Sequence, residues 1–156
     1  MYYLLIRHGK TDANRLTRAA FGKAGAPLNE VGQGQARRLR DELLTLGIDL
    51  AHEPVAISEF LRTKETAEYA GLQRLEVNSL LNEVKTPDPV RTNAMIAEGT
   101  LPPEARLAAQ KILKHPPRQK IWITHGLIIA ALCAELGQTD SSKMVPDFCE
   151  IVRIEF

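Results

Sequence analysis

The sequence predicts an α/β fold, a three-layer α/β/α sandwich with a mostly parallel central sheet. Short apolar runs of strand length alternate with amphipathic stretches of helical spacing along the whole chain. Two of these runs, 4–6 and 121–123, are continuously apolar, as expected of strands that are buried on both faces. The chain has 156 residues, a length that fits one domain with a real core, so we expect residues 1–156 to form a single domain.

Five segments are expected to form strands. They are Tyr2–Arg7, Pro54–Ser58, Arg74–Asn78, Gln119–Thr124 and Cys149–Phe156. Four helices are expected between them, because each helical stretch ends at a glycine or before a proline pair. They cover about 30–46, 61–70, 103–115 and 127–136. The segments 10–28 and 79–101 are less regular and rich in Gly, Pro and polar residues, so we expect functional loops there.

The first helix shows these signals most fully. Asn29 is a good N-cap, and Gly47 can take the left-handed conformation that commonly ends a helix. Between them, an apolar stripe recurs at helical spacing and is expected to be buried: Ala36, Leu39, Leu43 and Leu46.

Composition excludes several classes of protein. Apolar residues make up 44% and charged residues 25%, and the net charge is +1, so nothing indicates disorder or a nucleic-acid partner. The apolar runs 1–6 and 127–134 are too short to span a bilayer or to act as a secretory signal, so we expect a cytoplasmic protein without membrane contact. Cys133 and Cys149 lack metal-ligand spacing and are expected to be buried, inert thiols.

Three short segments lie just past the ends of predicted buried strands. They are Arg7-His8-Gly9, Ser58 to Arg62, and His125-Gly126. In open α/β sheets, ligands bind outside the carboxyl ends of the strands. The sequence therefore predicts that two histidines and two arginines converge on one crevice.

Each of these residues also has an ordinary explanation when taken alone. A single histidine after a strand is often only hydrogen-bonded, an arginine often pairs with a surface carboxylate, and a glycine can serve a turn that needs positive φ. Their shared edge favours a site, and its chemistry suits phosphate. Arginine matches phosphate oxygens bidentately, and a neutral imidazole can attack phosphorus. No metal or cofactor is required for this chemistry.

At these residues the sequence resembles the histidine phosphatase superfamily, the phosphoglycerate-mutase-like group. The resemblance rests on Arg7-His8-Gly9, on Pro27 to Gly32 with Gln35-Ala36, on Ser58 to Arg62 with Thr66-Ala67, and on Thr124-His125-Gly126. It implies that His8 is the phosphorylated nucleophile and that Arg7, Arg62 and His125 form the rest of the phosphate pocket. It further implies that Asn14 and Gly22 contact the phosphate, and that Glu83 protonates the leaving oxygen and then activates water.

The departures from that pattern indicate the small phosphatases of the superfamily. After Glu83, residues 84–89 lack the Gly-rich segment usual in mutases, and the distance to 123 leaves no room for a large cap. No tail follows residue 156, so we expect an open site that admits water. The predicted function is hydrolysis of a phosphomonoester, with a small phosphorylated metabolite as substrate.

Three other functions remain open on the sequence: a protein phosphohistidine phosphatase acting on a phosphoprotein, a phosphoglycerate-type mutase, and a catalytically weak phosphate-binding regulatory module. The basic residues between 10 and 23 form either a solvated loop or a rim that attracts a substrate with additional negative charge. Other polar residues are assigned no catalytic role. Glu59, Lys64, Glu65 and Glu68 are expected on a solvated helix face, His52 and His115 on the surface, and Trp122 in the core.

Overall fold

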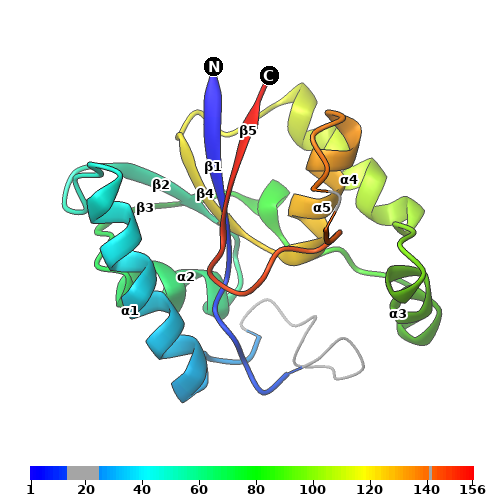
Figure 1. Ribbon diagram of the computed structural model, residues 1–156, viewed down its shortest axis with the longest axis horizontal. Helices are drawn as coiled ribbons and strands as arrows, with labels where there is room; N and C mark the ends of the chain where they lie inside the picture. The colour runs from blue at the N-terminus through cyan, green and yellow to red at the C-terminus, as the bar shows by residue number, and fades with distance from the viewer. Residues whose placement is uncertain (14–24, 141) are drawn as a thin grey trace.

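The computed structural model describes residues 1–13, 25–140 and 142–156. Its centre is a five-stranded sheet with the strand order β3-β2-β4-β1-β5 (Figure 1). The strands are β1 (Tyr2–Arg7), β2 (Pro54–Ile57), β3 (Arg74–Val77), β4 (Ile121–Thr124) and β5 (Ile151–Glu155). All neighbouring strands run parallel except β5, which is antiparallel to β1. The predicted mostly parallel sheet is confirmed, with strand ends that differ by one or two residues.

The helices of the described chain include all four that the sequence predicts. The α-helices are α1 (Glu30–Thr45), α2 (Leu61–Tyr69), α3 (Pro89–Ala97), α4 (Pro103–Lys114) and α5 (Gly126–Glu135), and η2 (Ser79–Leu81) is a short 3-10 helix. Asn29 caps α1 by accepting a hydrogen bond from the Gly32 amide at 2.8 Å, and Gly47 has a φ of +80°. The expected cap and stop of this helix are therefore confirmed. Its stripe is buried at Ala36, Leu39 and Leu43, but the expectation is wrong for Leu46, which is exposed because the helix ends there.

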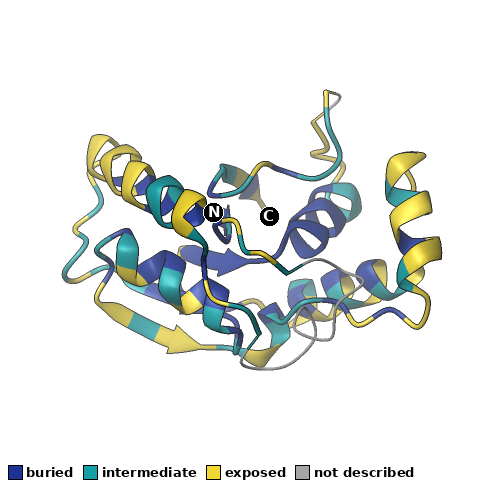
Figure 2. Cartoon of the chain, turned by 90° about the horizontal axis from the view of Figure 1, so that it is seen from below, coloured by how far each residue is buried: buried dark blue, intermediate teal, exposed yellow. Residues whose placement is uncertain are grey.

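Helix α3 was not expected, because residues 79–101 show no regular apolar pattern. Of its residues only Thr92 is buried, so the helix has no apolar stripe for periodicity to detect. Its end signals are present: the Asp88 side chain accepts from the Arg91 amide at 3.0 Å, and Pro89 occupies the first turn. Exposed residues cover most of this helix in Figure 2.

Two apolar clusters lie on the two faces of the sheet and make the three predicted layers. Successive β1 side chains point to opposite faces, so Leu4 and Ile6 join the cluster under α1 and α2, while Tyr3 and Leu5 join the cluster under α4 and α5. Trp122 is fully buried in the second cluster, as predicted, and donates its indole N–H to the Gln119 carbonyl at 2.6 Å.

The sheet carries an antiparallel edge strand, β5, which pairs with β1 along its inner side. On its outer side, the Gln138 amide donates to the Glu155 carbonyl at 2.7 Å and accepts from the Glu155 amide at 3.0 Å. One side chain thus occupies both main-chain groups of an edge residue, which shields that part of the edge.

The cysteines and two of the histidines lie away from this sheet edge, and the structure confirms the expected burial or exposure of each. Cys133 and Cys149 are free and buried, and burial raises the pKa of the Cys149 thiol to about 12, which makes it inert at neutral pH. His52 and His115 are exposed, as expected. Within residues 1–13, 25–140 and 142–156, no helix has the length and apolar character needed to cross a membrane.

Candidate active site

The predicted convergence occurs at the carboxyl ends of β1, β2 and β4. The rings of His8 and His125 lie 5.2 Å apart between centroids, and the Arg62 Nε–H donates to His8 Nε2 at 3.3 Å. Arg7 precedes His8 at the end of β1 and reaches the same region through its guanidinium group, which lies next to Gly126. Residues 117 positions apart in sequence therefore meet because β1 and β4 are adjacent parallel strands. Asn14 and Gly22, the two expected phosphate contacts of the loop, lie outside the described residues.

His8 is a buried, neutral imidazole with a defined tautomer. Its Nδ1 lies 2.7 Å from the Gly9 carbonyl oxygen, which can only accept, so Nδ1 carries the hydrogen and Nε2 keeps a lone pair. Burial, together with the Arg62 and Arg7 charges, lowers the pKa of His8 to about 3. Nε2 therefore carries no proton at neutral pH, which is the state that a nucleophile requires, and its lone pair accepts the hydrogen bond from Arg62 at 3.3 Å.

Arg62 lies in the first turn of α2 and is only 4% exposed. Its guanidinium carbon lies 4.5 Å from the centroid of the Phe60 ring, so an aromatic face supports the charge. Thr66, one turn later, donates to the Arg62 carbonyl at 2.7 Å and accepts from the Gly9 amide at 2.9 Å. This one hydroxyl group ties the His8 loop to the helix that carries Arg62.

His125 is the N-cap residue of α5 and is completely buried. Its Nε2 lies 2.9 Å from Ser58 Oγ, at the end of β2, and Ser58 Oγ in turn lies 2.9 Å from Thr63 Oγ1. The Phe60 ring meets His125 edge-on at 5.0 Å. The ring of His125 is thus fixed by a hydroxyl pair on one side and an aromatic ring on another, which leaves Nδ1 facing Glu83.

Gly9 and Gly126 are needed for close approach and not for positive φ. Neither has a φ in the left-handed region. A Cβ on Gly9 would lie 2.8 Å from the Gly32 carbonyl oxygen, and a Cβ on Gly126 would lie 3.0 Å from Arg7 Nε and 2.7 Å from Val145 Cγ1. The missing side chains therefore let α1 and α5 start directly against the residues of the site.

Glu83, the expected acid, reaches the same site. It follows η2, and its side chain is 11% exposed. Its Oε2 lies 3.9 Å from Arg62 Nη2 and 3.8 Å from His125 Nδ1, distances too long for direct hydrogen bonds. Its Oε1 accepts from the Val84 amide at 2.9 Å. The carboxyl group is therefore next to a guanidinium group and an imidazole, where it can exchange a proton with a bound group.

The segment that carries Glu83 is anchored by its neighbours. Asn82 accepts from the Glu59 amide at 2.8 Å and donates to the Glu59 carboxylate at 2.9 Å, and Thr124 donates to the Leu81 carbonyl at 2.7 Å.

The expectation of a solvated face is therefore wrong for Glu59, and also for Glu65, whose carboxylate accepts from the Leu28 amide at 2.8 Å. Both carboxylates are half-buried because loops that are distant in sequence fold over them. The expectation holds for Lys64 and Glu68, which are exposed.

Two residues at the site were not predicted from the sequence. The Pro146 carbonyl accepts from Arg7 Nη1 at 2.8 Å, and the ring of Phe148 lies 3.9 Å from the Arg7 guanidinium carbon. Both contacts with Arg7 span about 140 positions of sequence, so local patterns do not reveal them. The one local signal is an aromatic residue just before the last predicted strand.

The arrangement suits an anion that carries phosphoryl oxygens. Two guanidinium groups and a second imidazole lie around the neutral imidazole of His8, and helices α2 and α5 both begin here, with the positive ends of their dipoles at the same sheet edge. Such groups stabilise the charge of a transferring phosphoryl group. In the described residues, no three His, Cys, Asp or Glu side chains are grouped so that they could hold a metal ion.

Comparison with known proteins agrees with this geometry. The structure of TTHB049 from Thermus thermophilus is similar at a TM-score of 0.70 and 26% identity, covering 100% of this chain and 94% of that one. The Mycobacterium tuberculosis open reading frame Rv3214 has a TM-score of 0.66 and 24% identity, covering 99% of this chain and 91% of that one, and shows the shared fold. The comparison with curated proteins gives no match. The family model "Histidine phosphatase superfamily (branch 1)" matches residues 3–90, more than half of the chain. The chain therefore belongs to the histidine phosphatase superfamily, branch 1.

Proposed function

We propose that this protein is a metal-independent phosphatase that hydrolyses a phosphomonoester through a covalent phosphohistidine at His8. Membership of the superfamily already indicates phosphatase- or mutase-type activity through phosphohistidine. The state of His8 supports the specific role most directly. Its Nδ1–H is held by the Gly9 carbonyl, its Nε2 lone pair faces Arg62, and its pKa is lowered to about 3 by burial and the nearby arginines.

In the proposed reaction, His8 Nε2 attacks phosphorus and the bond from phosphorus to the leaving oxygen breaks. Glu83 gives its proton to that oxygen, so the first product leaves as an alcohol. Water then attacks phosphorus while Glu83 takes a proton from it, the N–P bond breaks, and inorganic phosphate is released with neutral His8 restored. Throughout, the positive charge on the phosphorylated imidazole is offset by the hydrogen bond from Nδ1 to the Gly9 carbonyl.

The position of α3 favours hydrolysis over a mutase reaction. A mutase has to keep water away from its phosphoenzyme while the substrate reorients in the site. The helix that follows Glu83 lies at the outer end of the molecule beside α4, away from the end of β1 (Figure 1). The described part of the segment after the acid therefore extends outward, consistent with a phosphoenzyme that water can reach. As substrate we propose a small phosphorylated metabolite, with the enzyme acting in the cytoplasm.

Turnover of a generic phosphomonoester, such as p-nitrophenyl phosphate, tests this function. We expect phosphate release that a chelator leaves unchanged and vanadate inhibits, with an acid-labile phosphoenzyme. The His8→Ala variant should lose the phosphoenzyme and more than ~1,000-fold of the turnover. His115→Ala, at an exposed histidine, should match the wild type.

Three results would contradict the proposal. Full turnover by His8→Ala would remove the nucleophile. Interconversion of phosphoglycerate isomers faster than their hydrolysis would show a mutase. Phosphate binding without any phosphoenzyme would show a binding module.

A further inference from the structure

The connection between α5 and β5 holds Arg7 by both its main chain and its side chain. Residues 143–150 of this connection are named the strap below. The Cys149 amide donates to the Arg7 carbonyl at 2.8 Å, and the Arg7 amide donates to the Glu150 carbonyl at 3.3 Å. The Pro146 carbonyl accepts from Arg7 Nη1 at 2.8 Å, and the Phe148 ring lies 3.9 Å from the guanidinium carbon. The strap therefore restricts both the position and the rotation of this guanidinium group.

The Phe148 ring connects the strap to the nucleophile as well. Its centroid lies 5.8 Å from the centroid of the His8 ring, and the residue is half-buried. The ring lies over the guanidinium group but is tilted against the imidazole, so a change in the strap acts mainly on Arg7.

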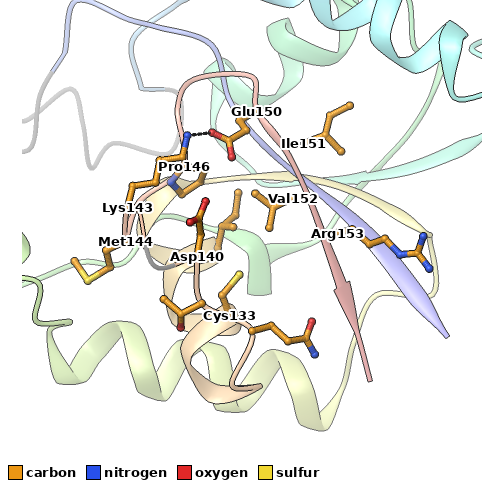
Figure 3. A pocket seen from close by; sticks show the side chains of 12 residues that line it. Cys133, Asp140, Lys143, Met144, Pro146, Glu150, Ile151, Val152 and Arg153 are labelled. Atoms are coloured by element: carbon orange, nitrogen blue, oxygen red, sulfur yellow. Dashed lines mark hydrogen bonds and ion pairs between the residues drawn. The ribbon is translucent and has the colours of Figure 1, made fainter.

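An ion-pair cluster fixes the conformation of the strap itself. Lys143 Nζ lies 2.6 Å from Glu150 Oε1 and 3.1 Å from Asp147 Oδ2, and Glu150 Oε1 also accepts from the Asp147 amide at 3.0 Å. Figure 3 shows Lys143 and Glu150 joined across the strap. These contacts close a loop between the two ends of the segment that presents Pro146 and Phe148.

Packing alone does not fix this segment. The strap borders a hollow of about 250 Å³, whose lining includes Met144 and Pro146 from the strap and Cys133 from α5 (Figure 3). Cys149 has a φ of +59°, a left-handed conformation that a non-glycine residue adopts only when its surroundings impose it. The strap is packed against the core at Val145 and Cys149 but borders a hollow on its other side, so its polar contacts contribute to keeping one conformation.

We propose that the strap is the positioning element of Arg7, and that the Lys143–Glu150 ion pair keeps it in place. The inference rests on the proposed function, in which Arg7 binds the phosphoryl oxygens. An arginine that is already ordered loses little side-chain entropy when its ligand binds, so binding is tighter than for a mobile side chain. Phe148 and Lys143 are positioning residues in this account, and Phe148 acts through the guanidinium that it stacks on.

A double-mutant cycle with Arg7 tests this inference. The dissociation constant for inorganic phosphate is measured for Phe148→Leu and Lys143→Met, first with Arg7 present and then in an Arg7→Ala background. With Arg7 present, we expect each substitution to weaken phosphate binding by roughly five- to tenfold, as expected when an ordered side chain becomes mobile. In the Arg7→Ala background, the same substitutions should change the constant by less than about twofold, because the group that they position is gone.

Matched controls separate positioning from general damage. Lys143→Arg keeps the ion pair and should keep wild-type affinity. Lys111→Met on α4 and Phe156→Leu after β5 repeat the two chemical changes at exposed positions and should leave phosphate binding unchanged. Thermal unfolding of every variant shows that the measurements are made on folded protein, and Lys143→Met carries the test if Phe148→Leu unfolds.

The outcomes distinguish this inference from the proposed function. Equal effects in both backgrounds, or no effect in either, would overturn the role of the strap. If phosphate affinities follow the expected cycle but the wild-type protein forms no phosphoenzyme, the proposed phosphatase alone is overturned. Wild-type protein that does not bind phosphate would overturn both.

Discussion

The two sides of the site are built differently. The proposed nucleophile side consists of Arg7, His8, Arg62 and His125, which lie at strand ends and helix starts and are held by main-chain groups, hydroxyl groups and aromatic rings. The proposed acid side consists of Glu83 on an irregular segment, with Arg62 and His125 as neighbours at 3.9 and 3.8 Å. The nucleophile side is held by contacts with elements that are distant in sequence, whereas the Glu83 carboxylate accepts a hydrogen bond from the adjacent Val84 amide at 2.9 Å.

This difference suits the two tasks. The phosphoryl group is the same in every phosphomonoester, so the groups that bind and attack it benefit from a rigid arrangement. The leaving oxygen belongs to the variable part of the substrate, and the proposed proton donor lies on a loop segment, 3.9 and 3.8 Å from its neighbours Arg62 and His125 across the site. We therefore expect substitutions on the nucleophile side to lower the turnover of every phosphomonoester. The effect of substitutions on the acid side should depend on how strongly the leaving group needs a proton.

Among the substitutions that compare the two sides, Glu83→Gln gives the largest expected effect and separates the sides most sharply. Hydrolysis of an alkyl phosphomonoester should fall by ~100-fold, since general acid–base catalysis typically contributes at least that factor. With p-nitrophenyl phosphate, whose leaving group needs no proton, we expect a rapid burst of one nitrophenolate per enzyme and accumulation of phosphoenzyme. Stopped-flow absorbance measures the burst, and Glu98→Gln at an exposed position is the control. Loss of the burst would mean that Glu83 also serves the nucleophile side.

The stability of the nucleophile side should depend on pH through His8. Its pKa is about 3 in the folded protein and near 6.5 in the unfolded chain, so the unfolded state binds the extra proton between these values. The contribution of neutral His8 to the free energy of unfolding is therefore fully present above pH 6.5 and is lost progressively as the pH is lowered toward 3. Relative to His8→Gln, the loss should approach roughly 1.4 kcal/mol for each pH unit within this window. Urea unfolding of both proteins at pH 7, 6 and 5 measures it, and parallel curves would contradict it.

Gly126→Ala disturbs the nucleophile side without removing a functional group. The new methyl group would meet Val145 and the Arg7 guanidinium, so the arginine has to move by a few tenths of an ångström. We expect the inhibition constant of phosphate to rise by about tenfold, the loss expected from weakening one charge-assisted hydrogen bond. Gly34→Ala in α1 is the matched control, because a Cβ there meets no heavy atom within 4 Å. Equal behaviour of the two variants would show that close approach at Gly126 is unimportant.

Asn82→Ala has the smallest expected effect and tests how the acid side is held. It removes both hydrogen bonds to Glu59, so the segment with Glu83 gains freedom while the carboxyl group remains. Turnover of an alkyl phosphomonoester should fall by roughly threefold, in line with the modest net value of such hydrogen bonds. The rate of nitrophenolate release from p-nitrophenyl phosphate in a single turnover should be unchanged. Asn93→Ala, at an exposed position of α3, serves as the control, and slower single-turnover release in Asn82→Ala would be evidence against independent sides.

The same contrast explains what could be predicted from the sequence. Runs such as Leu4 to Ile6 are apolar because both faces of their strand are buried, so they mark the sheet, and its edge then places His8 and His125. Glu83 was found through resemblance to the superfamily alone, since an acid on an irregular loop has no periodic signal.

Features without a buried stripe, or with contacts distant in sequence, were missed. Helix α3 has capping signals but buries little, so apolar periodicity does not reveal it. Glu59 looks like a surface residue at its helix start, because its partner Asn82 lies 23 positions away. The contacts of Phe148 with Arg7 depend on the chain returning to its first strand, which local patterns do not report.

The strand order has a consequence for how the protein is made. Strand β1 leaves the ribosome first, yet its neighbours in the sheet, β4 and β5, are synthesised more than a hundred residues later. Until then, its apolar residues have no lasting strand partners, and pairing across such separations folds slowly. The nascent chain therefore carries His8 long before it has a site, and phosphate binding should report completion of the last strand.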